Sequence, residues 1–154
     1  MWLIPAHTDL VAAESELVSV VGREVILRDA LDSAGEEYDY VLIDCPPSLG
    51  ILTLNALAAV EEVFIPLQPH FLALHGLSKL LETIDVVAKR LNDRLRLSGV
   101  VLCLYDSGTR LAAEVSQDVD EFFLAARGQE TPWAGARTFR TRIRRNVRLA
   151  EAPS

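Results

Sequence analysis

The hydrophobic residues of this chain fall into short continuous runs that alternate with longer stretches of helical spacing. A continuous apolar run is typical of a strand buried on both faces, whereas apolar residues three and four positions apart indicate an amphipathic helix. Helices that alternate with buried strands favour an α/β fold with a doubly wound, mostly parallel sheet. The pattern predicts strands at 40–43, 63–67 and 97–104, helices at 24–31, 52–60, 74–91 and 111–126, and a short apolar run at Trp2-Leu3-Ile4 that ends at Pro5.

Length and composition fit one globular domain over residues 1–154. Of the 154 residues 50% are hydrophobic and 24% charged, and a domain of this size buries roughly 70% of its unfolded surface. No apolar stretch approaches the roughly 18 residues of a membrane span, and the N-terminus lacks the basic and then apolar order of a secretion signal. We therefore expect a cytoplasmic protein with no membrane partner.

The two cysteines, Cys45 and Cys103, lie far apart, each in or beside an apolar run. Zinc sites and redox pairs use closely spaced cysteines such as C-x-x-C, and the sequence contains no such pair. We therefore expect two buried, reduced thiols.

The apolar run at 40–43 ends in a carboxylate, Asp44, and the prolines Pro46 and Pro47 prevent a helix from starting there. Parallel α/β sheets bind their ligands beyond the carboxyl ends of the strands, so Asp44 is a candidate metal-side group. A phosphate-binding loop that would accompany it has the form G-x-x-x-x-G-K-[ST]. Both lysines, Lys79 and Lys89, follow residues other than glycine, so the sequence contains the carboxylate without this loop.

Residues 137–154 form a basic segment on an acidic protein. They carry 6 basic side chains and 1 acidic one, residues 1–136 carry 9 basic and 21 acidic ones, and the whole chain has a net charge of −7. Clustered arginines bind phosphates bidentately and release counterions, so binding to a nucleic-acid backbone is one interpretation. A solvated helix that pairs with the acidic remainder is the other. The arginines of this cluster are Arg137, Arg140, Arg142, Arg144, Arg145 and Arg148.

Several separated segments carry motifs in a consistent order. They are 38–50 with its continuation 52–57, Pro66-Leu67-Gln68 with 73–77, Tyr105-Asp106 with Thr109 and Leu111, and 143–154. Together they resemble the ParA/Soj family of chromosome- and plasmid-partitioning ATPases, in the P-loop group that has a deviant Walker A lysine. The first segment resembles the Walker B and switch II motifs of that family, and the last resembles its late signature. The resemblance runs from Leu3 to Ser154 and implies a P-loop NTPase-like fold.

The resemblance implies an ATPase that uses ATP and Mg²⁺. Asp44 would hold Mg²⁺ through a water molecule, and Asp44, Pro46 and Pro47 would form the switch II segment that senses the γ-phosphate. This role agrees with the usual coordination of Mg²⁺, which keeps several waters and binds one or two carboxylates plus substrate phosphates. We assign no catalytic residue to this chain.

The resemblance also implies partners. The nucleotide-bound dimer of the family binds DNA non-specifically, is associated with the nucleoid and is stimulated by a ParB-like centromere-binding protein. Arg145 and Arg148 would contact the DNA backbone, and Arg127 is a weaker candidate.

The P-loop of the family, with its lysine and its Mg²⁺-ligating Ser or Thr, precedes the part that this sequence resembles, and the family continues beyond Ser154. We therefore expect a partial ParA-type nucleotide-binding domain, from a fragment or a truncated chain, that does not hydrolyse ATP alone. By resemblance, the strand before the P-loop is central to the sheet and neighbours the Walker B strand. Without it, buried backbone groups would be left unpaired at about 1–3 kcal/mol each.

We also consider functions of other classes for the same residues. A nucleotide-independent DNA-binding or interaction module would use only the C-terminal arginine cluster. Septum-positioning and iron–sulfur-carrier relatives share the Asp-x-Pro-Pro motif, but the chain has no C-x-x-C for the iron–sulfur function and no C-terminal amphipathic membrane helix for the septum function. The partitioning function fits best.

Overall fold

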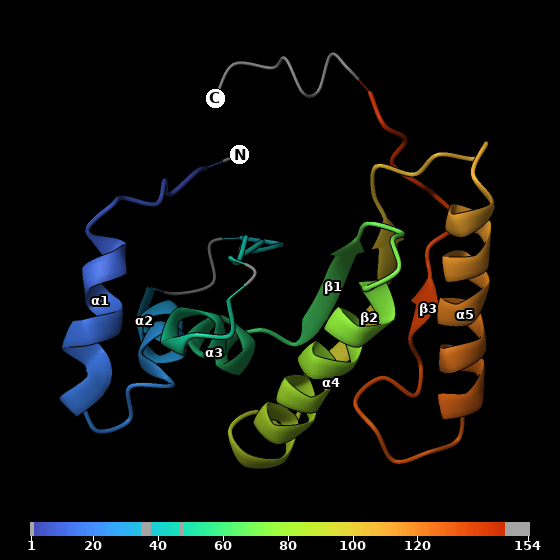
Figure 1. Ribbon diagram of the computed structural model, residues 1–154. Coiled ribbons are helices and arrows are strands. Elements are labelled where there is room, and N and C mark those ends of the chain that lie inside the picture. The colour runs from blue at the N-terminus through green and yellow to red at the C-terminus, as the bar shows by residue number, and fades with distance from the viewer. Residues whose placement is uncertain (1, 35–37, 47, 147–154) are drawn as a thin grey trace.

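The computed structural model describes residues 2–34, 38–46 and 48–146 (Figure 1). The first part of the chain forms α1 (Leu10–Glu16), a 3₁₀ turn (Leu17–Ser19), α2 (Ile26–Ala34) and α3 (Ile51–Ala59). Strands and helices then alternate as β1 (Glu62–Leu67), α4 (Ala73–Arg90), β2 (Arg96–Leu102), α5 (Arg110–Ala126) and β3 (Arg137–Thr138). The predicted alternation from residue 52 to residue 126 is confirmed, with element ends that differ by a few residues.

The three strands form one parallel sheet in the order β1-β2-β3. β1 pairs with β2 along its length, with an irregular register between Val63 and Phe64. β3 adds two pairs at β2, and Arg137 lies opposite Gly99. A Cβ atom at Gly99 would clash with the Arg137 carbonyl oxygen, so glycine permits the close approach of β3. The α/β class with a mostly parallel sheet is confirmed.

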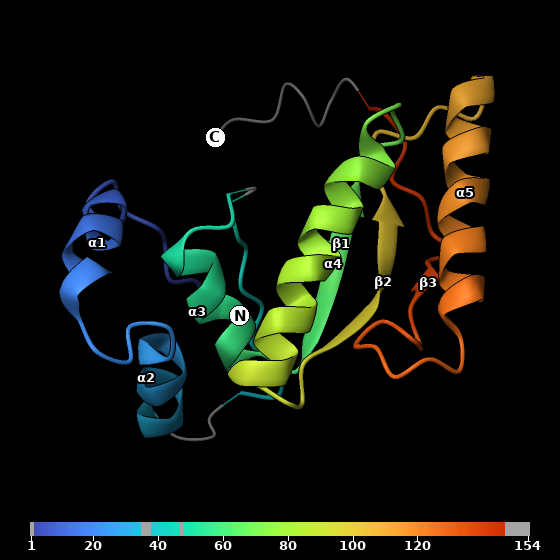
Figure 2. The same cartoon turned by 60° about the horizontal axis from the view of Figure 1, so that its bottom comes forward.

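The hydrophobic core lies between one face of the sheet and the helices α4 and α5, which contact each other (Figure 2). Side chains alternate along β1, so Ile65 and Leu67 are buried while Phe64 is 47% exposed on the other face. The apolar stripe of α4 belongs to this core. The most buried large side chains of the core are Ile84, Val87, Leu95, Leu97, Val100, Leu102 and Val119.

The predicted strand at 40–43 is wrong. These residues pair with no strand of the described chain, and the Tyr40 and Leu42 side chains are each 88% exposed. A strand is stable beside a neighbour that shares its backbone hydrogen bonds, and in the described ranges β1 pairs with β2 alone. The apolar run at 2–4 is exposed as well. Both segments have the composition of buried strands, but within the described part of the chain no neighbouring strand covers them.

Two further features differ from the sequence pattern. The pattern does not predict α1, whose seven residues contain few large apolar side chains. The interpretation of the C-terminal segment as a solvated helix is wrong for residues 137–146, which are extended and follow β2. Among the described residues, no helix combines the length and the apolar character needed to cross a membrane.

Candidate functional site

Asp44 and Pro46 are exposed and lie in the irregular segment that leads into α3. Pro47 lies outside the described residues. Where this segment reaches α3, the buried Thr53 hydroxyl donates a hydrogen bond of 2.6 Å to the Ser48 carbonyl oxygen. The segment is therefore anchored at its α3 end, while Asp44 remains open to solvent.

The Asp44 carboxylate is accessible to a cation. It forms no ion pair with another described residue, and in the same ranges no cluster of three or more His, Cys, Asp or Glu side chains could hold a metal ion. Mg²⁺ does not require such a cluster, because it keeps several waters and binds one or two carboxylates together with substrate phosphates. A single accessible carboxylate fits Mg²⁺ held through water.

Cys45 lies beside Asp44 and is exposed, so the prediction of a buried thiol is wrong at this position, because the run at 40–43 is not covered. Cys103 is half-buried. Partial burial of the sulfur and then repulsion by the Asp44 carboxylate raise the pKa of the Cys45 thiol. Burial also raises the pKa of the Cys103 thiol.

We expect Asp44→Asn to make Cys45 more reactive at a given pH. Removing the negative charge lowers the Cys45 pKa and thereby increases the fraction of reactive thiolate. The measurement is the rate of alkylation by iodoacetamide from about pH 7 to about pH 10, which brackets the usual cysteine pKa, in a Cys103→Ser background. Asp39→Asn is the matched control and leaves the pH profile in place. An unchanged profile in Asp44→Asn would show that the two groups do not interact.

Asn55 links the start of α2 to α3. Its side-chain nitrogen donates to the carbonyl oxygens of Arg23 (2.6 Å) and Ile51 (2.9 Å), and its oxygen accepts from the Leu27 N–H (3.0 Å). The residue is 5% exposed. Sequence reasoning does not identify this residue, and its signal is a polar amide inside a mostly apolar helix.

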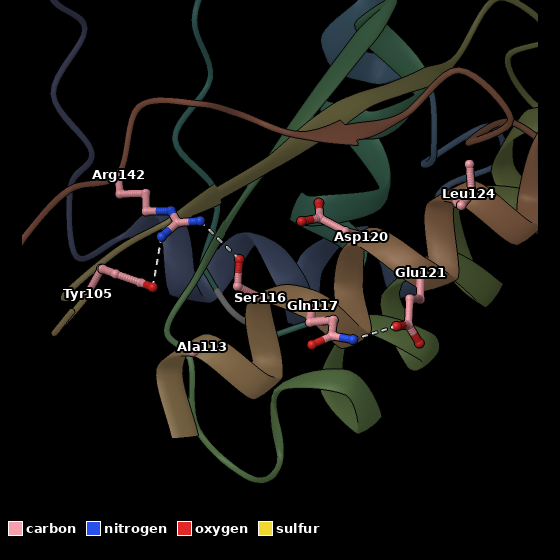
Figure 3. A pocket seen from close by; sticks show the side chains of 8 residues that line it. All are labelled: Tyr105, Ala113, Ser116, Gln117, Asp120, Glu121, Leu124 and Arg142. Carbon is pink, nitrogen blue, oxygen red and sulfur yellow. Dashed lines mark hydrogen bonds between the residues drawn. The ribbon is translucent and has the colours of Figure 1, made fainter. Parts of the chain in front are cut away.

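Arg142 is exposed, but it differs from the other described arginines of the cluster because its guanidinium group is hydrogen-bonded to two buried side chains (Figure 3). It donates to the Tyr105 hydroxyl (2.7 Å) and to the Ser116 hydroxyl (3.3 Å), and its central carbon lies 4.4 Å from the centre of the Tyr105 ring. Both partners are buried. The guanidinium also lines an open cavity of about 330 Å³ beside α5, where Asp120 and Glu121 form part of the wall.

Other arginines of the cluster face solvent near the N-terminal end of α5. Arg144 forms an isolated bridge with Tyr105, shortly before α5 begins, and Arg145 follows it. Both are exposed, and neither pairs with an acidic side chain among the described residues. Arg110, the first residue of α5, lies at the same end and pairs with Glu114 at 2.6 Å. Sequence reasoning does not single out Arg110, although its position just after the loop that follows β2 is a usable signal.

Arg127, the weaker candidate, is not at this surface. Arg127 caps the C-terminal end of α5, and a helix of 17 residues is about 25 Å long. It therefore lies far from Arg145. Arg148 lies outside the described residues.

Known proteins resemble this chain along nearly its whole length. The family model described as an AAA domain matches residues 1–97. The chain is 47% identical over 152 residues to the chromosome partitioning protein ParA of Myxococcus xanthus strain DK1622 and 45% identical over 152 residues to the sporulation initiation inhibitor protein Soj of Bacillus subtilis strain 168. Each match covers 99% of this chain but only 50% and 56% of the relative, respectively. The chain thus spans about half the length of these curated relatives.

Solved structures show the same fold. The cobyrinic acid a,c-diamide synthase of Mycobacterium smegmatis superposes with a TM-score of 0.71 at 44% identity over 76% of this chain and 48% of its own, and it is also known with bound ADP and magnesium. Apo McdA of Cyanthece, at 20% identity, has a TM-score of 0.78 over 96% of this chain and 56% of its own, which supports the fold alone. The parallel α/β arrangement is therefore P-loop NTPase-like. The AAA domain model matches more than half of the residues of this chain, and the relatives named above are ParA and Soj proteins. The chain belongs to the ParA/Soj family of chromosome partitioning ATPases.

Proposed function

We propose that this chain supplies the magnesium-side carboxylate and the DNA-binding surface of a ParA-type partitioning ATPase. The observation that carries the proposal is the 47% identity to ParA of Myxococcus xanthus, which extends along 99% of the chain and so includes both the Asp44 segment and the arginine-rich segment. The two segments differ in their chemistry and are tested separately.

In the proposed nucleotide site, Asp44 holds Mg²⁺ through a water molecule. When bound, the metal neutralises charge on the phosphates of ATP. Pro46 and Pro47 restrict the backbone next to Asp44, because a proline ring fixes φ. The hydrogen bond between Thr53 and Ser48 would then pass a change in this segment to α3.

The proposed site needs a phosphate-binding loop from outside residues 1–154, because the sequence contains no G-x-x-x-x-G-K-[ST] motif. We therefore propose that these residues alone bind ATP weakly and do not hydrolyse it measurably. A self-dimer, a ParB-like partner and association with the nucleoid belong to the same proposal and concern the complete protein.

In the proposed DNA surface, Arg145 and Arg148 contact backbone phosphates without reading base sequence, and Arg144 extends this surface. Arg144 and Arg145 support it because both are exposed and have no acidic partner among the described residues. A guanidinium that is free of carboxylate partners can form bidentate hydrogen bonds with phosphate.

We expect the chain to bind random duplex DNA with an affinity that falls as the salt concentration rises. Arg145→Ala should weaken binding and reduce the slope of log affinity against log salt by about 0.9, which is the change expected for one lost phosphate contact. Fluorescence anisotropy over a salt series measures both quantities. Arg127→Ala is the matched control, because it removes the same charge at the far end of α5, and we expect a smaller effect. Equal losses in the two variants would argue for a diffuse charge effect instead of a defined surface.

A second function, a nucleotide-independent DNA-binding module, is favoured by one observation. Backbone hydrogen bonds join Phe139 and Ile143 to β2, and Tyr105 to Ile143. None of these bonds involves the Asp44 segment. Such a module would bind DNA equally well with and without ATP and Mg²⁺. A clear gain in affinity on adding the nucleotide would exclude it.

A further inference from the structure

Within residues 139–145 of the arginine-rich segment, the structure shows few backbone hydrogen bonds to the rest of the protein. β3 has two residues, after which regular pairing stops. Beyond it the Phe139 N–H donates to Val100 (2.9 Å), the Ile143 N–H donates to Leu102 (2.8 Å), and the Tyr105 N–H donates to Ile143 (3.0 Å). A segment with so few backbone bonds depends on its side chains to keep one course.

Arg142 supplies such a side-chain attachment. Its two hydrogen bonds reach the loop after β2 through Tyr105 and the middle of α5 through Ser116, and these partners are 7% and 5% exposed. Its planar guanidinium also lies over the Tyr105 ring at 4.4 Å, where the ring face attracts a cation. One side chain thus joins three parts of the fold, as the dashed lines in Figure 3 show.

The attachment lies directly beside the surface arginines. Arg144, two residues after Arg142, forms the backbone bridge with Tyr105. Tyr105 therefore contacts both residues, Arg142 through its hydroxyl and Arg144 through its backbone. Loss of the Arg142 contacts would free this stretch from α5. It would not remove any of the exposed positive charges.

We propose that Arg142 is a positioning residue, which fixes the segment 139–146 against Tyr105 and Ser116 so that Arg144 and Arg145 are held at the DNA surface, and does not itself contact phosphate. This inference rests on the DNA binding proposed above. Within a cluster of six arginines, it separates one structural member from the members that bind.

The test uses variants that keep the net charge. Tyr105→Phe combined with Ser116→Ala removes both hydrogen-bond acceptors of Arg142, and Arg142→Lys keeps the charge but loses the planar fork. Arg140→Lys is the matched control, because Arg140 is exposed in the same segment. The readouts are the affinity for random duplex DNA, its salt slope, and hydrogen exchange at the Ile143 amide, with the Leu97 amide, which donates to Pro132, as the internal reference.

We expect Tyr105→Phe/Ser116→Ala and Arg142→Lys each to weaken DNA binding about threefold to tenfold, as for the loss of a few hydrogen bonds, with an unchanged salt slope and faster exchange at Ile143 but not at Leu97. Arg140→Lys should change none of these. If DNA binding stays at the wild-type level or becomes tighter in Tyr105→Phe/Ser116→Ala, Arg142 is not a positioning residue. A wild-type chain that does not bind DNA would overturn the proposed function and this inference with it, whereas the exchange rate would still show whether the attachment exists.

Discussion

Leu102→Ala is expected to lower the free energy of unfolding by about 2–5 kcal/mol. The Leu102 side chain is 0% exposed at the end of β2 and belongs to the core cluster that α4 and α5 share with the sheet. Truncation removes its apolar contacts and leaves a cavity, because elements on several sides prevent the site from collapsing. Against a typical total of about 5–15 kcal/mol, this is a large part of the stability of the domain.

Urea denaturation followed by circular dichroism measures this loss. Leu124→Ala is the matched control, because Leu124 is 60% exposed on the outer face of α5, and a surface change of this kind stays within about 0.5 kcal/mol. Similar losses at the two positions would mean that the core does not lie between the sheet and the two helices.

Asn55→Ala is expected to have the second largest effect, because it leaves the Leu27 N–H and the Arg23 carbonyl without their partner. An unpaired buried polar group costs about 1–3 kcal/mol. The loss should be concentrated in the first part of the chain, since Asn55 joins the start of α2 to α3. Local opening of α2 would then be easier than opening of the sheet.

Hydrogen exchange at the Leu27 amide is the direct measurement, and we expect it to become much faster in Asn55→Ala. Ser33→Ala is the control, because the Ser33 hydroxyl donates to the Asp29 carbonyl on the exposed side of the same helix. If Leu27 remains protected in Asn55→Ala, the amide does not hold α2 in place.

The central part of the fold follows from the hydrophobic pattern. The runs at 63–67 and 97–104 become strands and the amphipathic stretches at 74–91 and 111–126 become helices, because these elements bury one another within the described residues. The run at 40–43 has an equally strong pattern and forms no strand. An apolar run indicates that a segment tends to be buried. A strand also requires a neighbouring strand, and the hydrophobic pattern does not show whether one is present.

The site could be predicted only in part for a similar reason. The sequence indicates Asp44 and the arginine cluster, because these are local motifs. It does not indicate that Arg142 hydrogen-bonds to Tyr105 and Ser116, since these partners lie 37 and 26 residues away in sequence. The sequence also does not indicate the hydrogen bonds of Asn55 with Leu27 and Arg23, which lie 28 and 32 residues away. Contacts of this kind come from tertiary packing, which composition and spacing do not encode.

Magnesium-dependent ATP hydrolysis decides whether Asp44 has the role proposed for it. The protein to measure is a chimera of Bacillus subtilis Soj in which this chain replaces the part of Soj that it matches. The chain alone is measured for comparison. We predict no measurable turnover from the chain alone, clear turnover from the chimera, and a loss of about 10–100-fold or more in the chimera with Asp44→Ala, as for partners that hold a metal through an outer shell. Robust hydrolysis by the chain alone, or a chimera that Asp44→Ala leaves fully active, would contradict that role.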